Sequence, residues 1–367
     1  MINLGFVPSR RLAFYMVKLF LTRSFAVLFA LILVLETLDL LGEAGKILAI
    51  PGNGDSALWH YVLLRIPLLI SRFLPFSVLL GTLIAFVGLN QNSEVVAMKA
   101  AGLSAHQILA PLVVASIAIA AALFAFNEGV AVNSARVVDA WSDNDYKPIP
   151  PASSVLGNVW LLNGDDFVRA GIVSGRGARM VLSNVSYYDR TGGVLQRVVN
   201  AERAVPNPAG GGWLLQNVTA YDATQNVVRH FARMEALPGV RPGQFTIAKV
   251  DPTELDYWTL KERTAELEAA GRPADEARAG LAHKLSQPLS ILLMPLLAAV
   301  AAFGLARSGQ VLMRAALGMA LGFAYFIADN FSLAMGNAGT YPPLIAAWAP
   351  FILFLLIGET VLVRTEE

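Results

Sequence analysis

The sequence predicts an α-helical integral membrane protein with six transmembrane helices, three on each side of an inserted all-β, jelly-roll-like domain. Of its 367 residues, 55% are hydrophobic and 15% are charged, whereas soluble domains carry roughly 25% charge. Long apolar segments occur in two groups of three. Between them lie about 110 residues in which short apolar runs are broken by Gly, Pro, Asn and Asp.

Three apolar segments precede the insertion, and each is long enough to cross about 30 Å of hydrocarbon as a helix. The first has a basic N-terminal flank and no small-residue cleavage site, which separates it from a secretory signal peptide. The second holds Pro67 and Pro75, which favour a bend. The expected spans are 24–41, 59–89 and 108–126.

The next segment has the sequence pattern of an all-β domain, in which turns such as Thr191–Gly193 and Pro208–Gly212 separate short apolar runs. Seven runs recur at intervals of roughly ten residues, typical of a sandwich or jelly roll. They are Val159–Asn163, Asp166–Val173, Arg179–Asp189, Gly193–Val205, Gly211–Ala223, Val227–Leu237 and Gly243–Ala248.

A charged linker helix from Tyr257 to Ala270 ends at Gly271-Arg272-Pro273, and a second helix leads into the last three spans. These spans are expected at 285–305, 311–335 and 344–363. Gly318 and Gly322 have the GxxxG spacing that favours close helix packing. Asp329 lies within the fifth span, where we expect a hydrogen bond to a neighbouring helix, with a transport role as the alternative.

The predicted domains are therefore four. Residues 1–135 hold the first three spans and a short helix at 92–102. Residues 136–255 form the β domain, 256–282 the linker helices, and 283–367 the last three spans.

Basic residues in the short connections predict the orientation. Only Lys46 lies on the side opposite the termini, so the positive-inside rule puts both termini and the 92–102 helix in the cytoplasm and the β domain outside. The basic residues on the terminal side are Arg10, Arg11, Lys18, Arg23, Lys99, Arg307, Arg314 and Arg364. The net charge of +1 argues against a nucleic-acid partner, and the absence of cysteine excludes disulfides and thiolate chemistry.

The segment Asn90–Ser104 is the organising feature of the chain. Asn92 or Ser93 suits the N-cap of a short helix, Gly102 suits its C′ position, and Glu94 and Lys99 complement its dipole. The helix also carries an apolar stripe of Val95, Met98 and Gly102. A helix this short lies beside the bilayer, so it is either a plain interfacial turn or a docking helix for a separate protein.

No catalytic or metal-binding constellation is present in the sequence. The nearest match to a P-loop, Gly304–Gly309, is followed by Gln310 and lacks the phosphate-binding lysine. There is no HExxH or GxSxG motif, and the four histidines are scattered. We therefore expect a chain that is not an enzyme and binds no cofactor or metal.

Five stretches in this order resemble the lipopolysaccharide-export permeases of the LptF/LptG type, and more the LptG branch. The core SEVVAMKAAG and the segment QPLS, on either side of a β insertion, carry most of the specificity. The stretches are Glu36–Lys46, Phe73–Ser104, His283–Ser290, Leu321–Asn330 and Pro342–Pro350.

The resemblance implies the permease of an ABC transporter that extracts lipopolysaccharide from the inner membrane and passes it to a periplasmic bridge. ATP and Mg would be used by a dimeric cytoplasmic ATPase (LptB-like), into which the helix at 92–102 plugs with Glu94. A second permease (LptF-like), a single-span accessory subunit (LptC-like) and a bridge protein (LptA-like) would complete the system. The first and fifth spans would form lateral gates to a central cavity.

A phosphorylated lipid requires cationic residues at the outer rim of such a cavity, because arginine binds phosphate bidentately. The candidates are Arg65, Arg72 and Arg136, although Arg65 also suits snorkelling to the outer headgroups. Glu36 is the fourth candidate cavity residue. It stands where members of the resembled family often carry a basic residue, and because it cannot bind phosphate directly, either it pairs with an arginine of its own cavity or the charge is supplied elsewhere. The alternative function is a membrane-anchored scaffold or receptor that displays the β domain without transport.

Overall fold

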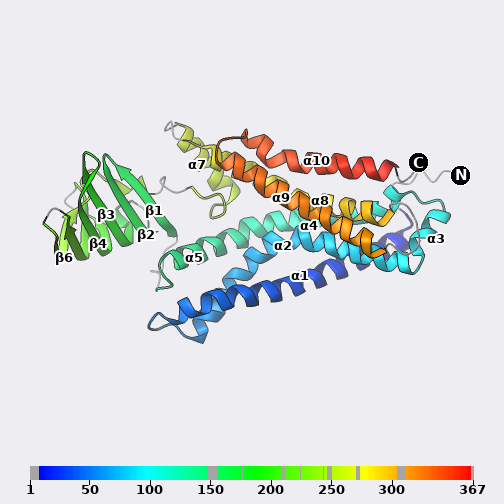
Figure 1. Ribbon diagram of the computed structural model, residues 1–367, viewed down its shortest axis with the longest axis horizontal. Helices are drawn as coiled ribbons and strands as arrows, with labels where there is room; N and C mark the ends of the chain where they lie inside the picture. Colours follow the sequence, from blue (N-terminus) through cyan, green and yellow to red (C-terminus); the bar gives the residue numbers. More distant parts are fainter. Residues whose placement is uncertain are drawn as a thin grey trace. The chain divides into compact units, whose positions relative to one another are not determined.

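The computed structural model describes residues 8–147, 155–175, 177–207, 211–223, 225–242, 244–245, 250–269, 273–303 and 311–364 (Figure 1). The chain divides into two compact units. The first comprises residues Met1–Asp39, Ile66–Ala131 and Asp256–Glu367, and the second Leu40–Arg65 and Val132–Leu255. The predicted turns at Gly271-Arg272 and Gly304–Gly309, and residues 208–210 of the turn Pro208–Gly212, lie outside the described residues.

Long helices dominate the first unit. Five of the six predicted spans each fall within one helix, and the described part of the fourth, residues 285–303, lies in the helix Asp275–Phe303. The helices that contribute to it are α1 (Arg10–Leu48), α2 (Asp55–Gln91), α3 (Glu94–Ala100), α4 (Ala105–Phe126), the π-helix η1 (Asn127–Ala131), α7 (Tyr257–Ala269), α8 (Asp275–Phe303), α9 (Val311–Asn337) and α10 (Pro343–Arg364). Figure 1 follows their order by colour.

Five helical segments of the described chain are long and apolar enough to cross a membrane. They are α1, α2, the continuous helix Ala105–Asp143, Ala316–Asn337 of α9, and α10. The class of helical membrane protein is therefore confirmed. Helix α8 contains residues 285–303 of the predicted fourth span but, over its described residues, does not meet the same criterion, so the count of six spans stays a prediction.

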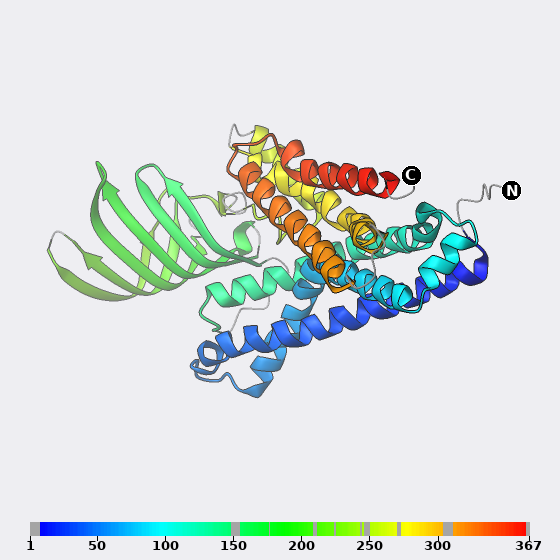
Figure 2. The ribbon, with the colours of Figure 1, turned by 45° about the vertical axis from the view of Figure 1, so that its right-hand side comes forward.

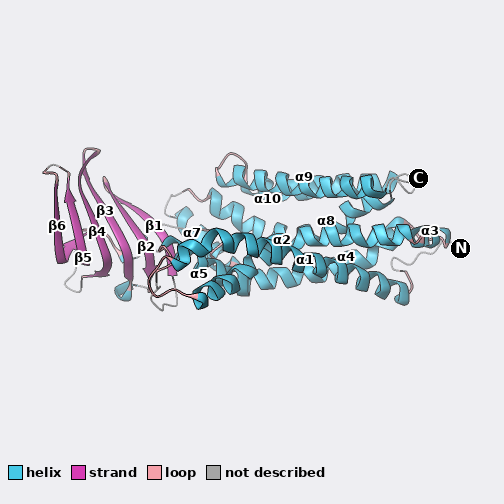
Figure 3. Ribbon diagram, turned by 60° about the horizontal axis from the view of Figure 1, so that its bottom comes forward, coloured by secondary structure: helices cyan, strands magenta, loops and turns pink. Residues whose placement is uncertain are grey.

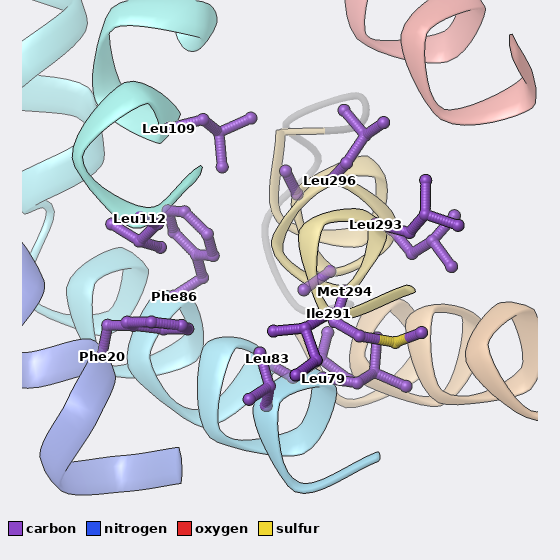
Figure 4. Close-up of a cluster of buried hydrophobic side chains, with 14 of the residues drawn as sticks. Phe20, Leu79, Leu83, Phe86, Leu109, Leu112, Ile291, Leu293, Met294 and Leu296 are labelled. Atoms are coloured by element: carbon purple, nitrogen blue, oxygen red, sulfur yellow. The ribbon is translucent and has the colours of Figure 1, made fainter. Parts of the chain in front are cut away.

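The core of the first unit is a single cluster of buried apolar side chains (Figure 4). Lipid tails are as apolar as these side chains, so close packing, more than exclusion of water, stabilises the contacts between the helices. Helices α1, α2, α4 and α8 meet in the cluster through Phe20, Leu79, Leu83, Phe86, Leu109, Leu112, Ile291 and Met294.

The linker helix α7 begins with a well-formed cap. Asp256 accepts hydrogen bonds from the backbone N–H of Thr259 at 3.0 Å and from its hydroxyl at 2.7 Å. Burial by itself would raise the pKa of Asp256, but these bonds, with those from nearby backbone N–H groups, lower the pKa below its ordinary value. The carboxylate thus satisfies donors that a helix start leaves without partners.

The second unit contains a six-stranded antiparallel sheet in the order β1-β2-β3-β4-β5-β6. Its strands are β1 (Val155–Asn163), β2 (Asp166–Ser174), β3 (Val181–Thr191), β4 (Val194–Pro206), β5 (Trp213–Asp222) and β6 (Val227–Ala236). A 3₁₀ turn, η2 (Gly177–Arg179), precedes β3. Figures 2 and 3 show that the strands form one strongly curved sheet.

The inserted antiparallel β domain is confirmed, but its strand order is simpler than the predicted jelly roll. Two-residue loops join β1 to β2 and β3 to β4, and loops this short connect only adjacent strands. In the second loop Gly192 and Gly193 have φ of 57° and 79°, as a type I′ turn requires. In the described residues of the seventh predicted run, Phe245 packs edge-to-face on Trp213 instead of pairing as a strand.

The unit that contains the sheet includes the residues from Val132 onward, ahead of its first strand. Helix α5 (Val132–Asp143) continues directly from η1, and the first strand begins at Val155. Helix α5 packs on β1 so closely that a Cβ at Gly157 would lie 3.0 Å from the Cα of Ala140. Within the same unit Trp141 and Tyr146 pack in a small core with Ile47, Tyr61 and Val138.

Candidate functional site

Helix α3 lies between α2 and α4, within the predicted range 92–102. It begins at Glu94, and Ser93 precedes it with φ of 60° and no hydrogen bond from its side chain to the helix. The predicted side-chain cap is therefore wrong, because a capping serine needs an extended backbone and Ser93 has a left-handed one. A side-chain cap that was not predicted occurs at the next helix, where Ser104 and Gln107 form a reciprocal capping box.

The end of α3 follows the prediction. Gly102 has φ of +85°, a conformation that costs glycine little. The N–H of Leu103 donates to Met98 O at 3.2 Å, and the N–H of Gly102 donates to Lys99 O at 2.9 Å. These two bonds are a complete Schellman motif, which stops the helix sharply and fixes the direction of the chain into α4.

The apolar stripe of α3 faces the core of its own chain. Val95 and Met98 are 4% and 8% exposed and belong to the main buried cluster, whereas Val96 is 64% exposed. The stripe is thus covered without any partner. A partner protein would meet the opposite face, which presents Val96, Ala97 and Ala100.

Both charged residues of α3 contact other helices of the first unit. The hydroxyl of Tyr15 in α1 donates to Glu94 Oε2 at 3.0 Å, and Asn92 Nδ2 lies 3.4 Å from Glu94 Oε1. At the other end, Lys99 Nζ lies 5.2 Å from the ring centroid of Phe303 in α8, a cation–π contact. Glu94 remains partly exposed, so it is accessible on the outer surface of the helix.

The four candidate lipid-contact residues have different environments. Glu36 is buried, Arg65 is half-buried, and Arg72 is exposed. Arg72 makes no hydrogen bond or ion pair with the part of the chain that the structure describes. Arg136, in contrast, donates through Nε and Nη2 to the backbone carbonyl of Glu254, at 3.3 and 3.0 Å. Its guanidinium therefore holds the chain segment that returns from the sheet.

A polar network inside the first unit was not found from the sequence. Lys284 Nζ of α8 lies 3.1 Å from Glu128 Oε1 of η1, and their side chains are only 13% and 17% exposed. The second oxygen of Glu128 accepts the backbone N–H of Tyr257, the first residue of α7. One carboxylate thus joins three helical elements.

A neighbouring glutamine extends this network to α2. Gln287 Oε1 accepts from Asn127 Nδ2 at 3.2 Å, and Gln287 Nε2 donates to Ser71 O at 3.0 Å. Pro75 lies four residues after Ser71 and has no N–H to donate to that carbonyl. Gln287 supplies the missing donor. The signal in the sequence was this proline, together with the glutamine of the QPLS segment.

The residues of the predicted packing site lie on α9. Gly318 and Gly322 are both buried, and a Cβ on Gly322 would lie 1.9 Å from Leu79 Cδ2 of α2. Asp329 Oδ2 lies 3.1 Å from His283 Nε2 of α8, with side-chain exposures of 13% and 20%. No group of three or more His, Cys, Asp or Glu that could hold a metal ion occurs among the described residues.

Comparison with known proteins agrees with the fold. The family model described as "Lipopolysaccharide export system permease LptF/LptG" matches residues 14–364. The chain is 26% identical over 337 residues to the Escherichia coli K12 protein "Lipopolysaccharide export system permease protein LptG", covering 90% of this chain and 91% of that one. It is 23% identical over 333 residues to the LptG protein of Haemophilus influenzae, covering 86% and 89%. The chain therefore belongs to the LptF/LptG family of lipopolysaccharide export permeases.

Proposed function

We propose that this chain is the membrane permease subunit of an ABC transporter that extracts lipopolysaccharide from the bacterial inner membrane and delivers it to a periplasmic bridge. The observation that carries the proposal is the family match over residues 14–364, which includes α3 and the helices on either side of it. The chain would supply the passage and the docking helix. A separate dimeric ATPase would bind ATP and Mg and hydrolyse the nucleotide.

The orientation follows from the charges. With the termini and α3 in the cytoplasm, Glu94 and the exposed residues Val96 and Lys99 face the ATPase, and the β-sheet lies in the periplasm. A second permease would complete the cavity, and the single-span subunit and bridge protein would receive the lipid on the periplasmic side.

Arg72 is the strongest of the cavity candidates because its guanidinium has no partner among the described residues. Its five N–H donors are thus available to a lipid phosphate, which guanidinium binds bidentately. Arg65 lies seven residues earlier, two helical turns away on the same face. Arg136 is a weaker candidate because its donors are used by Glu254 O.

A charge reversal on α3 tests the docking role. In the complex reconstituted with its ATPase and second permease, Glu94→Arg is expected to abolish ATPase binding and lipid extraction together. Glu262→Arg, the same reversal at an exposed position of α7, is the matched control and is expected to change neither. If Glu94→Arg behaves like this control, α3 is a plain connector and the scaffold interpretation is favoured.

A second charge reversal tests the lipid contact. Arg72→Glu is expected to reduce photo-crosslinking of lipopolysaccharide from positions lining α2, because a carboxylate repels phosphate. Arg72→Lys retains the positive charge but loses the bidentate geometry, so it should retain part of the crosslinking. Normal crosslinking in Arg72→Glu would return this arginine to a structural role.

A further inference from the structure

We propose that Tyr15 is a positioning residue that joins the docking helix α3 to the first span, so that α1 moves when the ATPase moves α3. This inference rests on the proposed function and adds a route by which motion leaves the docking helix. The chain itself links α3 only to α2 and α4. The contacts of Glu94 and Lys99 add α1 and α8.

A side-chain hydrogen bond joins α1 to α3. The phenol of Tyr15 donates to the Glu94 carboxylate at 3.0 Å across 79 residues of sequence. Directly after Tyr15, Met16 is 2% exposed, and Phe20 one turn later is fully buried, both in the same core cluster as Val95 and Met98. Figure 2 shows the dark blue start of α1 beside the cyan segment that contains α3.

Helix α3 itself is short and sharply terminated. The helix has seven residues, about 10 Å, and ends in a Schellman motif, so it has little freedom to bend. Glu94 is its first residue, and Lys99 lies in its last turn. Each end therefore contacts a different helix, and a displacement of α3 is transmitted to α1 at one end and to α8 at the other.

The carboxylate of Glu94 can accept more than one hydrogen bond at the same time. A carboxylate has two oxygens and about four acceptor positions. Tyr15 uses Oε2, and Asn92 lies near Oε1 at the outer limit of a hydrogen bond. Glu94 can therefore accept a donor from the ATPase while it keeps Tyr15. The same residue would then be the docking contact and the link to α1.

The experiment uses Tyr15→Phe in the full reconstituted complex. Tyr15 is 43% exposed, so the loss of its hydroxyl leaves a protein that folds. A hydrogen bond to a charged group at an exposed site contributes about 1 kcal/mol, which converts to roughly a fivefold effect. We expect unchanged ATPase binding and a roughly fivefold drop in lipopolysaccharide released per ATP hydrolysed.

The controls separate this inference from a general loss of stability. Tyr221→Phe removes a similar exposed tyrosine bond, the one to Asn226 Oδ1 at 2.9 Å in the β-sheet, and is expected to change neither quantity. Tyr15→Lys restores a donor to Glu94 and should recover most of the lipid released per ATP. A lysine that restores nothing would contradict the hydrogen bond as the cause.

A distance measurement tests the mechanical link directly. The chain has no cysteine, so spin labels can be placed at Phe14→Cys in α1, whose native side chain is 70% exposed, and at Ala101→Cys, the exposed residue directly after α3. With Tyr15 present we expect one distance in the nucleotide-free and ATP-bound states. With Tyr15→Phe the distance should change between these states.

Two results would overturn the proposal: equal lipid release per ATP in Tyr15→Phe and wild type, or a label distance that changes with nucleotide even when Tyr15 is present. Either result would leave the docking role of Glu94 intact, because that role is judged by binding of the ATPase to Glu94→Arg. If instead Glu94→Arg still binds the ATPase, the proposed function itself fails.

Discussion

Removing the charge of Glu128 is the sharpest test of the polar network. Glu128→Gln would leave the ammonium of Lys284, 13% exposed and 3.1 Å from its present partner, without a counter-charge. It would also weaken the acceptor for the N–H of Tyr257. Removing one partner of a buried pair costs 3–5 kcal/mol. Since both side chains keep some exposure, we expect the lower end, about 3 kcal/mol.

The assay is unfolding in mixed micelles titrated with a denaturing detergent and followed by circular dichroism. Glu262→Gln on the exposed face of α7 is the matched control and should stay within about 0.5 kcal/mol of wild type. The double variant Glu128→Gln/Lys284→Met should lose at least about 1 kcal/mol less than the sum of the single variants. Additive losses, or a single variant as stable as the control, would refute the buried pair.

Three further predictions concern packing, capping and the β domain. Gly322→Ala should cost about 1–3 kcal/mol of stability, because it forces a methyl group against Leu79. Adding Leu79→Ala should offset part of this loss. Gly88→Ala is the control: open space surrounds Gly88, so this variant should be neutral or stabilising in the same assay. Folding lowers the pKa of Asp256, so its carboxylate stabilises the start of α7 at pH values above the ordinary pKa of 3.8. This stabilisation is lost as the pH falls through the pKa of the folded state. In the wild-type protein, the amides in the first turn of α7 should exchange faster with solvent as the pH falls through this range. In Asp256→Asn, which has no carboxylate to protonate, this acceleration should be absent. The indole N–H of Trp213 donates to Val240 O at 2.9 Å. Trp213→Phe removes this donor and leaves the buried carbonyl unsatisfied, so thermal unfolding of the sheet should show a loss of about 1–3 kcal/mol.

The elements that follow from local sequence signals were predictable. The predicted span at 344–363 and helix α10 differ by one residue at each end, because uninterrupted apolar length is a strong signal. Gly102 at the end of α3 was predictable for a similar reason, since glycine is the residue that adopts the left-handed conformation at low cost. In both, the deciding information lies within a few turns of the chain.

The relations between distant segments were not predictable. Glu128 and Lys284 are 156 residues apart, and no periodicity indicates that a π-helix turns Glu128 toward α8. Ser93 suits a cap by residue type, but its left-handed backbone is a consequence of how α2 turns into α3. The same holds for Arg136, whose role depends on where Glu254 returns from the sheet.

The bond from Gln287 to the carbonyl of Ser71 has a consequence for how this protein evolves. A proline at position 75 is tolerable in an apolar segment because an amide on a different helix serves the carbonyl that the proline leaves without a donor. A related chain without the proline would not need the glutamine, and a chain that lost only the glutamine would have an unsatisfied carbonyl at position 71. Positions 75 and 287 should therefore change together among homologues, as a correlated pair separated by 212 residues of sequence.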